Sequence, residues 1–305
     1  MVHIFIINSL VVDKKVSDNL RRHLEKRNDI KWFAFNTSHT GMETEITQKM
    51  IQFFDGEKIR FYCCGGSGTV RNVMHGTGDY KDVEIAFYPC GSTNDFLKVY
   101  GEDQKLFNDI DNLIDGRVEK IDYIKTNYGV ALNTLSLGID SQLSYYLTDA
   151  SEYSIFGNAV PYFIAYMKAI VKMRPRMLNI QVADKTYNDN ISEMIVANGC
   201  VLGGGLYIAE SANFKDGLLE YFIAPNASSI GLLKIILKMM NKKTEEVKKE
   251  VIFGEMSVME IRSEDEKSIT FNLDGEIVRG GSYWKIEAVK KGMSFIVPHG
   301  VKSIS

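Results

Sequence analysis

The chain has 305 residues, about twice the usual domain size, so we expect two domains. It carries 36 Lys and Arg against 39 Asp and Glu, and this net charge of −3 argues against a nucleic-acid-binding protein, whose binding domain is normally basic. Hydrophobic residues make up 45% and charged residues 25%, which is typical of a globular chain and argues against long disorder.

The chain also lacks the usual signals for secretion or membrane insertion. Its opening sequence, MVHIFIINSL, has no basic region and no small-residue cleavage site, which argues against a secretory signal. The most apolar stretch, residues 153–173, is interrupted by Asn158, Pro161 and Lys168, so it predicts a core or interfacial helix and no membrane span.

The pattern of the cysteines also argues against a secreted protein. None of the four belongs to a CxxC pair, and two of them are adjacent within an apolar run: Cys63, Cys64, Cys90 and Cys200. This pattern predicts buried, reduced thiols and neither a zinc site nor a disulfide framework. We therefore expect a cytoplasmic protein.

The first third of the chain alternates strand-like with helix-like segments. Short apolar runs predict strands at residues 3–8, 31–37, 59–64, 84–91 and 118–127. Helical spacing of apolar residues predicts helices at 16–27, 45–55 and 108–116. This alternation predicts a mainly parallel sheet with helices on both faces.

The second half is mostly strand-like. Strands are predicted within 128–139, 176–187, 191–201, 217–225, 257–263, 268–275 and 283–289. The polar segments 187–190 and 263–268 are interpreted as hairpin turns, and helices are predicted at 161–173 and 228–243, the second capped by Ser228 or Ser229. The second half should therefore form a mostly antiparallel β domain.

Two polar loops follow strands of the first third. Gly65-Gly66-Ser67-Gly68-Thr69 leads from a strand into a helix, and glycines at such a place allow a phosphate close to the backbone. Ser92, Thr93, Asn94 and Asp95 follow the next strand. A tight turn and a helix N-cap are the alternative interpretations, but two such loops on neighbouring parallel strands favour a ligand at the carboxyl edge of the sheet.

Two acidic turns lie in the second half. Asp216-Gly217 precedes a strand, and Asp274-Gly275-Glu276 separates two strand-like runs. Taken alone, each is interpreted equally well as a polar turn, because Asp-Gly is a common hairpin sequence.

In this order the elements resemble the lipid kinase family that includes bacterial diacylglycerol kinases and sphingosine kinases, with NAD kinases and phosphofructokinases as distant relatives. The glycine-rich loop resembles the GGDGT motif of that family, with Asn72 in its continuation, and residues 89–95 resemble its P-x-G-T-x-N-D loop. Further matches, covering nearly the whole chain, are Asp122, Asn133 with 138–140, Asn198 with 203–205, Asp216-Gly217 and Asp274-Gly275-Glu276.

The resemblance implies a nucleotide-binding α/β domain, residues 1–126 with about 291–305, a β-sandwich domain for the lipid, residues 127–290, and an active-site cleft between them. It implies ATP bound by Asn8, Gly65, Gly66, Ser67, Gly68, Thr69, Asn72, Thr93, Asn94 and Asp95. It implies Glu276 as the catalytic base with Asp274 beside it, and Mg²⁺ near Asn213, Asp216, Leu218 and Asp122. The implied partner is a lipid at the membrane surface, reached by peripheral contact; a homodimer is left open.

Two departures from the family pattern concern the nucleotide end. Ser67 stands where the family has an acidic residue, and the loop after the first strand, residues 8–13, lacks the usual proline and glycine. The leading hypothesis is therefore an ATP-dependent lipid kinase whose activity Ser67 could impair. The alternatives are a non-catalytic nucleotide- or lipid-binding protein of the same fold and a kinase for a soluble small molecule.

Overall fold

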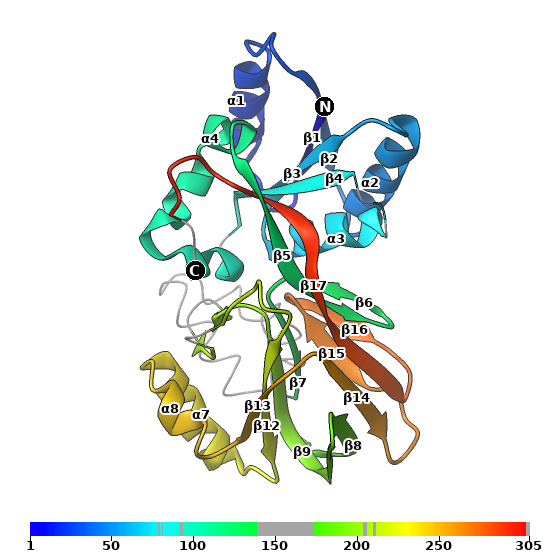
Figure 1. The fold of residues 1–305 in the computed structure, drawn as a ribbon, viewed down its shortest axis with the longest axis vertical. Coiled ribbons are helices and arrows are strands. Elements are labelled where there is room, and N and C mark those ends of the chain that lie inside the picture. Colours follow the sequence, from blue (N-terminus) through cyan, green and yellow to red (C-terminus); the bar gives the residue numbers. More distant parts are fainter. Residues whose placement is uncertain are drawn as a thin grey trace. The chain divides into compact units, whose positions relative to one another are not determined.

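The computed structural model in Figure 1 describes residues 1–78, 80, 82–91, 94–138, 174–203, 206–209 and 212–302. The chain divides into two compact units: unit 1 holds Met1–Asp122 and the segment from Lys291 onward, and unit 2 holds Tyr123–Lys290. Thr93, the predicted helix 161–173 and the apolar stretch 153–173 lie outside the described residues.

Unit 1 alternates strands and helices along the chain. Its strands are β1 (Val2–Asn8), β2 (Lys31–Thr37), β3 (Ile59–Gly65), β4 (Val83–Pro89), most of β5 (Arg117–Thr126) and the end of β17 (Tyr283–Val297). Its helices are α1 (Lys14–Leu24), α2 (Met42–Phe53), α3 (Ser67–Thr77), the 3-10 helix η1 (Asp95–Asn108) and α4 (Ile110–Ile114).

The sheet of unit 1 is parallel, in the order β2-β1-β3-β4-β17. Every residue of the central strand β3 is buried, because the strand has neighbours on both edges and helices pack against the sheet. The last strand comes from the other end of the chain: Phe295 and Ile296 of β17 pair with Ile85 and Ala86 of β4.

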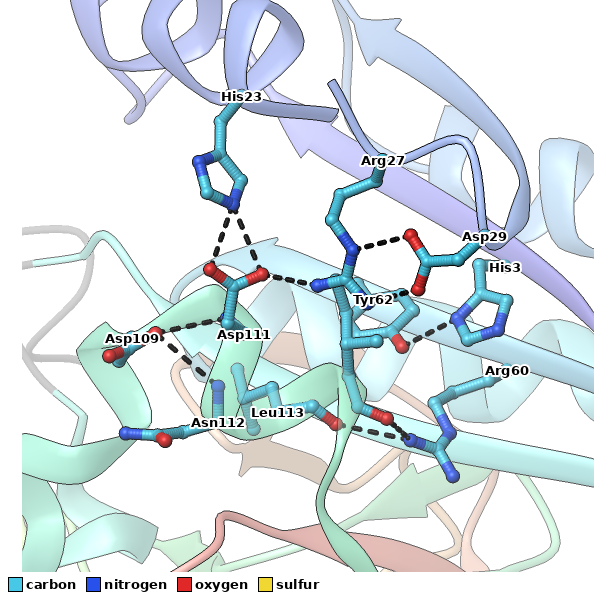
Figure 2. A network of polar contacts seen from close by, with 11 residues as sticks. His3, His23, Arg27, Asp29, Arg60, Tyr62, Asp109, Asp111, Asn112 and Leu113 are labelled. Carbon is cyan, nitrogen blue, oxygen red and sulfur yellow. Dashed lines mark hydrogen bonds and ion pairs between the residues drawn. The ribbon is translucent and has the colours of Figure 1, made fainter. Parts of the chain in front are cut away.

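A polar network stands at the amino ends of these strands and joins them to α1 and α4 (Figure 2). Asp111 of α4 accepts hydrogen bonds from His23 at 3.1 Å and from Arg27 at 2.5 Å. The buried Arg60 donates to the carbonyl oxygens that end α4, at 3.1 Å for Leu113 and 2.6 Å for Ile114. The network therefore lies at the amino ends of the strands, and the glycine-rich loops lie at the opposite, carboxyl ends.

Unit 2 is mostly antiparallel. Its strands are β6 (Gly129–Ala131), β7 (Thr134–Leu137), β8 (Arg176–Val182), β9 (Lys185–Ala197), β10 (Val201–Leu202), β11 (Leu206–Tyr207), β12 (Leu219–Pro225), β13 (Ile252–Met256), β14 (Val258–Ser263), β15 (Thr270–Leu273), β16 (Glu276–Arg279) and the start of β17. Its described helices are α7 (Ser229–Met240) and α8 (Thr244–Val247).

Strand β9 connects the two parts of the unit 2 sheet. Its first half pairs with β8, while its second half lies between β7 and β12. One core, with Trp284 and Phe271, fills the space between these strands; a second, with Phe222 and Ile235, lies between the sheet and α7. The α/β domain and the mostly antiparallel β domain predicted from the sequence are both confirmed.

Some local predictions were wrong. The hairpin between β8 and β9 turns at Ala183 and Asp184, because Val182 pairs with Lys185, and residues 187–190 continue the strand. The segment 263–268 joins β14 to β15, which pair with other strands. Among the cysteines, Cys63 and Cys64 are buried as expected, whereas Cys90 and Cys200 are half-buried.

The described helices are short. In the part of the chain that the structure covers, none of them is long and apolar enough to cross a membrane.

Candidate functional site

The carboxyl ends of β1, β3 and β4 lie side by side in unit 1. Asn8, at the end of β1, donates from Nδ2 to Thr69 Oγ1 in the first turn of α3 at 3.1 Å, and its own Oδ1 accepts the backbone N–H of Leu10 at 3.0 Å. One side chain thereby holds both the loop after β1 and the start of α3. The predicted residues Asn8 and Thr69 are brought together.

The two polar loops touch through their glycines. The backbone N–H groups of Cys90 and Gly91 both donate to Gly65 O, at 2.8 and 3.1 Å. A Cβ added to Gly91 would lie 2.9 Å from Gly66 Cα, and one added to Gly65 would lie 2.3 Å from Thr69 Oγ1. Close approach of the two backbones therefore requires glycine at Gly91, and the Thr69 side chain leaves no room for a Cβ at Gly65.

Gly68 is a glycine of a different kind. It lies in the first turn of α3, next to Ser67, and a Cβ added to it would meet nothing within 4 Å. Packing therefore does not explain this glycine, whereas free access of an anion to the helix N-terminus would. Ser67 opens the helix and is partly exposed at the same edge.

The second loop adds an unsatisfied polar atom. Asn94 Nδ2 donates to Gly91 O at 3.1 Å, whereas Asn94 Oδ1 is buried and has no hydrogen-bond partner among the described residues. A buried acceptor without a donor is costly, so this atom suits a ligand with an N–H or O–H group. Asp95 is buried beside it and forms an ion pair with Lys98 at 2.9 Å.

Asn72 is turned into the protein interior. Its Nδ2 donates to Glu43 Oε2 at 3.2 Å, and Glu43 Oε1 accepts from Thr37 at 3.0 Å. Asn72 therefore satisfies a buried carboxylate on α2, and its role in binding ATP stays a prediction.

Cys90 lies within the second loop but is not set up as a nucleophile. Burial raises the pKa of its thiol to about 11. Since the thiolate is the reactive form, Cys90 stays an inert thiol at neutral pH.

In unit 2, Asp274-Gly275 forms the two-residue turn between β15 and β16. Leu273 pairs with Glu276, and φ is +50° at Asp274 and +94° at Gly275. Positive φ at both central positions is the type I′ geometry that favours Asp-Gly. The turn sets Glu276 at the first position of β16, where it is partly exposed.

The Asp274 carboxylate binds the backbone of residues 132–134, just before and at the start of β7. It accepts the backbone N–H groups of Leu132 at 2.5 Å, Asn133 at 3.0 Å and Thr134 at 2.8 Å. All three donors belong to buried residues. These bonds tie the β15–β16 hairpin, which carries Glu276, to residues 132–134, and the catalytic role of Asp274 stays a prediction.

Two asparagines complete this arrangement and were not among the predicted site residues. Asn133 Nδ2 donates to Val201 O at 2.9 Å, and Asn198 Nδ2 donates to Leu132 O at 2.7 Å. Both side chains are buried, and the Asn133 backbone oxygen accepts the N–H groups of Asn198 and Gly199. Their presence in the family-like motifs was the available signal, and the structure shows that three of those motifs converge.

The remaining predicted residues lie in two places. Asn213 Oδ1 accepts the N–H of Lys215 at 3.1 Å, and Asp216 Oδ1 accepts that of Leu218 at 2.8 Å, so they form one exposed turn in unit 2. Asp122, in unit 1, is fully buried and accepts the N–H of Lys291 at 2.6 Å. Within the described residues, no group of three or more His, Cys, Asp or Glu could hold a metal ion.

Comparisons with known proteins agree with this layout. The family model described as "Diacylglycerol kinase catalytic domain" matches residues 3–126, and the model described as "YegS C-terminal NAD kinase beta sandwich-like domain" matches residues 133–285. A "Putative lipid kinase" of Staphylococcus carnosus (strain TM300) is 25% identical over 224 residues, which cover 72% of this chain and 70% of that protein.

A second relative, a "Putative lipid kinase" of Staphylococcus aureus (strain MSSA476), is 31% identical over 182 residues, and the match spans 58% of this chain and 57% of that protein. Among solved structures, the "Crystal structure of a putative diacylglycerol kinase from Bacillus anthracis str. Sterne" superposes with a TM-score of 0.76 at 21% identity. That match covers 98% of this chain and 96% of the other, and at this identity it shows the fold.

The fold defines a two-domain protein of the kind that pairs a parallel α/β domain with a mostly antiparallel β-sandwich. With both family models matched in order along the chain, the protein belongs to the diacylglycerol kinase family of lipid kinases.

Proposed function

We propose that the protein transfers the γ-phosphoryl group of ATP to the hydroxyl group of a membrane lipid such as diacylglycerol. The observation that carries the proposal is the contact between the two glycine loops at the carboxyl edge of the unit 1 sheet, with Gly68 open and the Asn94 acceptor unsatisfied. Nothing else in the described packing of unit 1 accounts for these two features together.

On the donor side, the first turn of α3 supplies backbone N–H groups and the positive end of a helix dipole for the phosphates. Asn8 holds this turn through Thr69, so the N–H groups are oriented before a ligand arrives. Asn94 Oδ1 then accepts a hydrogen bond from the nucleotide, from a ribose hydroxyl or a base amine.

On the acceptor side, Glu276 accepts the proton of the lipid hydroxyl as that oxygen attacks the γ-phosphorus of ATP, whose bond to the β,γ-bridging oxygen breaks to release ADP. Its backbone is fixed by the type I′ turn and by the Asp274 carboxylate, which ties the hairpin to residues 132–134. Both carboxylate oxygens of Asp274 already accept hydrogen bonds from backbone N–H groups. We therefore assign the role of base to Glu276.

The exposed turn 213–218 suits Mg²⁺ in chemistry, because Asn213, Asp216 and the Leu218 carbonyl offer oxygen atoms, the ligands that this ion prefers. When bound, the ion neutralises phosphate charge that the protein residues leave uncompensated.

Ser67 favours a second candidate function, a protein that binds nucleotide or lipid without catalysis. A serine at the first position of α3 carries no charge, where the family pattern has a carboxylate. The loops would then still bind nucleotide while turnover was lost.

The two functions are separated by an assay with radiolabelled ATP across a panel of lipids that includes diacylglycerol, comparing wild type with Glu276→Gln. Phosphorylated lipid from wild type, and little from the variant, supports the kinase. Nucleotide binding by calorimetry without product from any lipid in the panel would reject the kinase and leave the binding protein.

A further inference from the structure

Helix α7 of unit 2 has a well-defined inner face. It begins after Ser228, whose side chain caps the helix by accepting the N–H of Gly231 at 3.1 Å. Leu232, Ile235 and Met239 are buried against the apolar face of the sheet that carries Phe222. Figure 1 shows α7 and α8 on the outside of β12 and β13. This buried inner face accounts for the packing of α7 against the sheet.

The outer face of α7 is apolar as well. Ile230, Leu237 and Met240 are 69%, 43% and 51% exposed, and Leu233 between them is half-buried. The spacing of three, four and three residues puts these four side chains, hereafter the outer stripe, on one side of the helix. The solvent face of a helix is normally polar, so an exposed stripe of this kind marks an interaction surface.

Lysines accompany the outer stripe. Lys234 follows Ile230 by four positions and precedes Leu237 by three, so it lies on the same side, and Lys242 and Lys243 follow the helix directly. Residues 228–251 contain six lysines and three glutamates, whereas the whole chain has a net charge of −3. The three glutamates form ion pairs within this segment: Glu246 with Lys238 and Lys243, Glu250 with Lys238, and Glu245 with Lys248. The segment keeps an excess of three lysines over glutamates.

We propose that the outer stripe of α7 docks the protein on the surface of an anionic lipid bilayer. Apolar side chains that enter the headgroup region, next to lysines that meet the anionic lipids, are the two components of reversible peripheral binding. A second copy of the chain suits this surface less well, because a symmetric contact would bring the same lysines face to face. The proposal concerns binding alone and does not require kinase activity.

The test is sedimentation of purified protein with vesicles of phosphatidylcholine, with and without phosphatidylserine. We expect wild type to bind the anionic vesicles, Leu237→Glu to bind at least about tenfold more weakly, and Lys234→Gln to bind about fivefold more weakly. The matched control is Phe53→Glu, which removes a 74% exposed apolar side chain from α2 in unit 1 and should bind as wild type does.

Thermal unfolding of each variant checks that it is folded, and a second stripe variant, Ile230→Glu, repeats the test at the other end of the helix. Failure of wild type to bind either kind of vesicle overturns the proposal, as does equal binding by the folded Leu237→Glu and Ile230→Glu. A wild-type dimer by light scattering that both stripe variants convert to monomers, without vesicle binding, would assign the stripe to a contact between copies. Kinase activity on a short-chain, water-soluble diacylglycerol is measured separately, so the failure of docking and the failure of the proposed function are distinguishable.

Discussion

Asp274 and Thr134 exchange hydrogen bonds: the Asp274 carboxylate accepts the backbone N–H of Thr134 at 2.8 Å, and the Thr134 carbonyl oxygen accepts the backbone N–H of Asp274 at 3.1 Å. The pair ties the β15–β16 hairpin to the start of β7. Because the hairpin carries Glu276, the position of the proposed base depends on a contact with Thr134, which is remote from it in sequence.

Asp274→Ala should destabilise unit 2. The change leaves three buried N–H groups, from residues 132–134, without their acceptor, and it puts alanine at a positive φ, so we expect a loss of about 2–4 kcal/mol in the free energy of unfolding. Asp274→Asn keeps an acceptor and tolerates the turn, so its loss should be smaller. Urea unfolding measures both, and an alanine variant as stable as wild type would show that the clamp contributes little.

Glu276→Gln should lower lipid phosphorylation by roughly 10²–10⁴-fold, because glutamine keeps the shape of the side chain but cannot take the proton. Glu276 is partly exposed at a strand start, so folding and nucleotide affinity should stay near those of wild type. Steady-state kinetics and calorimetry on the same preparations provide the comparison. An equally active variant would exclude Glu276 as the base.

Ser67→Asp should raise phosphoryl transfer if Ser67 limits the rate. Aspartate is also well tolerated at the start of a helix, because its charge faces the positive end of the helix dipole. Ser67→Asn, which adds similar bulk without charge, is the matched control and should not raise the rate. If the aspartate variant folds, binds ATP and is no faster than wild type, Ser67 is not the limiting feature.

Gly68→Val should impair ATP binding, whereas Gly65→Ala should impair stability. A Cβ at Gly68 meets nothing within 4 Å, so the valine variant should fold and lose ATP binding because its side chain projects where the phosphates approach. A Cβ at Gly65 would lie 2.3 Å from Thr69 Oγ1, so the alanine variant should lose stability first. Calorimetry with ATP, alongside thermal unfolding, separates the two. Unchanged ATP affinity in Gly68→Val would remove this loop from the nucleotide site.

Stability should fall at mildly acidic pH because of His3. Burial, and next the charge of Arg60, lower the pKa of His3 from 6.5 to about 4. Below pH 6.5 the unfolded chain takes up a proton that the folded chain does not, so the free energy of unfolding should fall as the pH drops from about 6.5 to about 4, by up to about 3 kcal/mol.

Thermal unfolding between pH 4 and pH 7.5 tests this dependence. His3→Gln should flatten the profile in that window, whereas the same change at the exposed His39 should leave it as in wild type. A profile that His3→Gln leaves unchanged would show that other groups cause the acid sensitivity. Since His3 Nδ1 shares a 2.7 Å hydrogen bond with Tyr62, the glutamine variant is also expected to be less stable at neutral pH.

The two fold classes and the positions of the loops could be predicted from the amino-acid pattern alone. Hydrophobic periodicity depends on neighbours along the chain, so strands such as 31–37 and the cap of α7 at Ser228 could be predicted within a residue or two. Both glycine loops were likewise visible, because glycine clusters after strands are local signals.

Which side chains of these motifs contact one another could not be predicted in this way, because it depends on how the chain packs. The hydrogen bond from Asn72 to Glu43 on α2, and those from residues 132–134 to the Asp274 carboxylate, are contacts that the motifs themselves do not reveal. The turn at Ala183 and Asp184 was fixed by the register of β8 on β9, which no local pattern marks. Such contacts join residues that are distant in sequence, and their geometry follows from packing and strand register, which one-dimensional patterns do not encode.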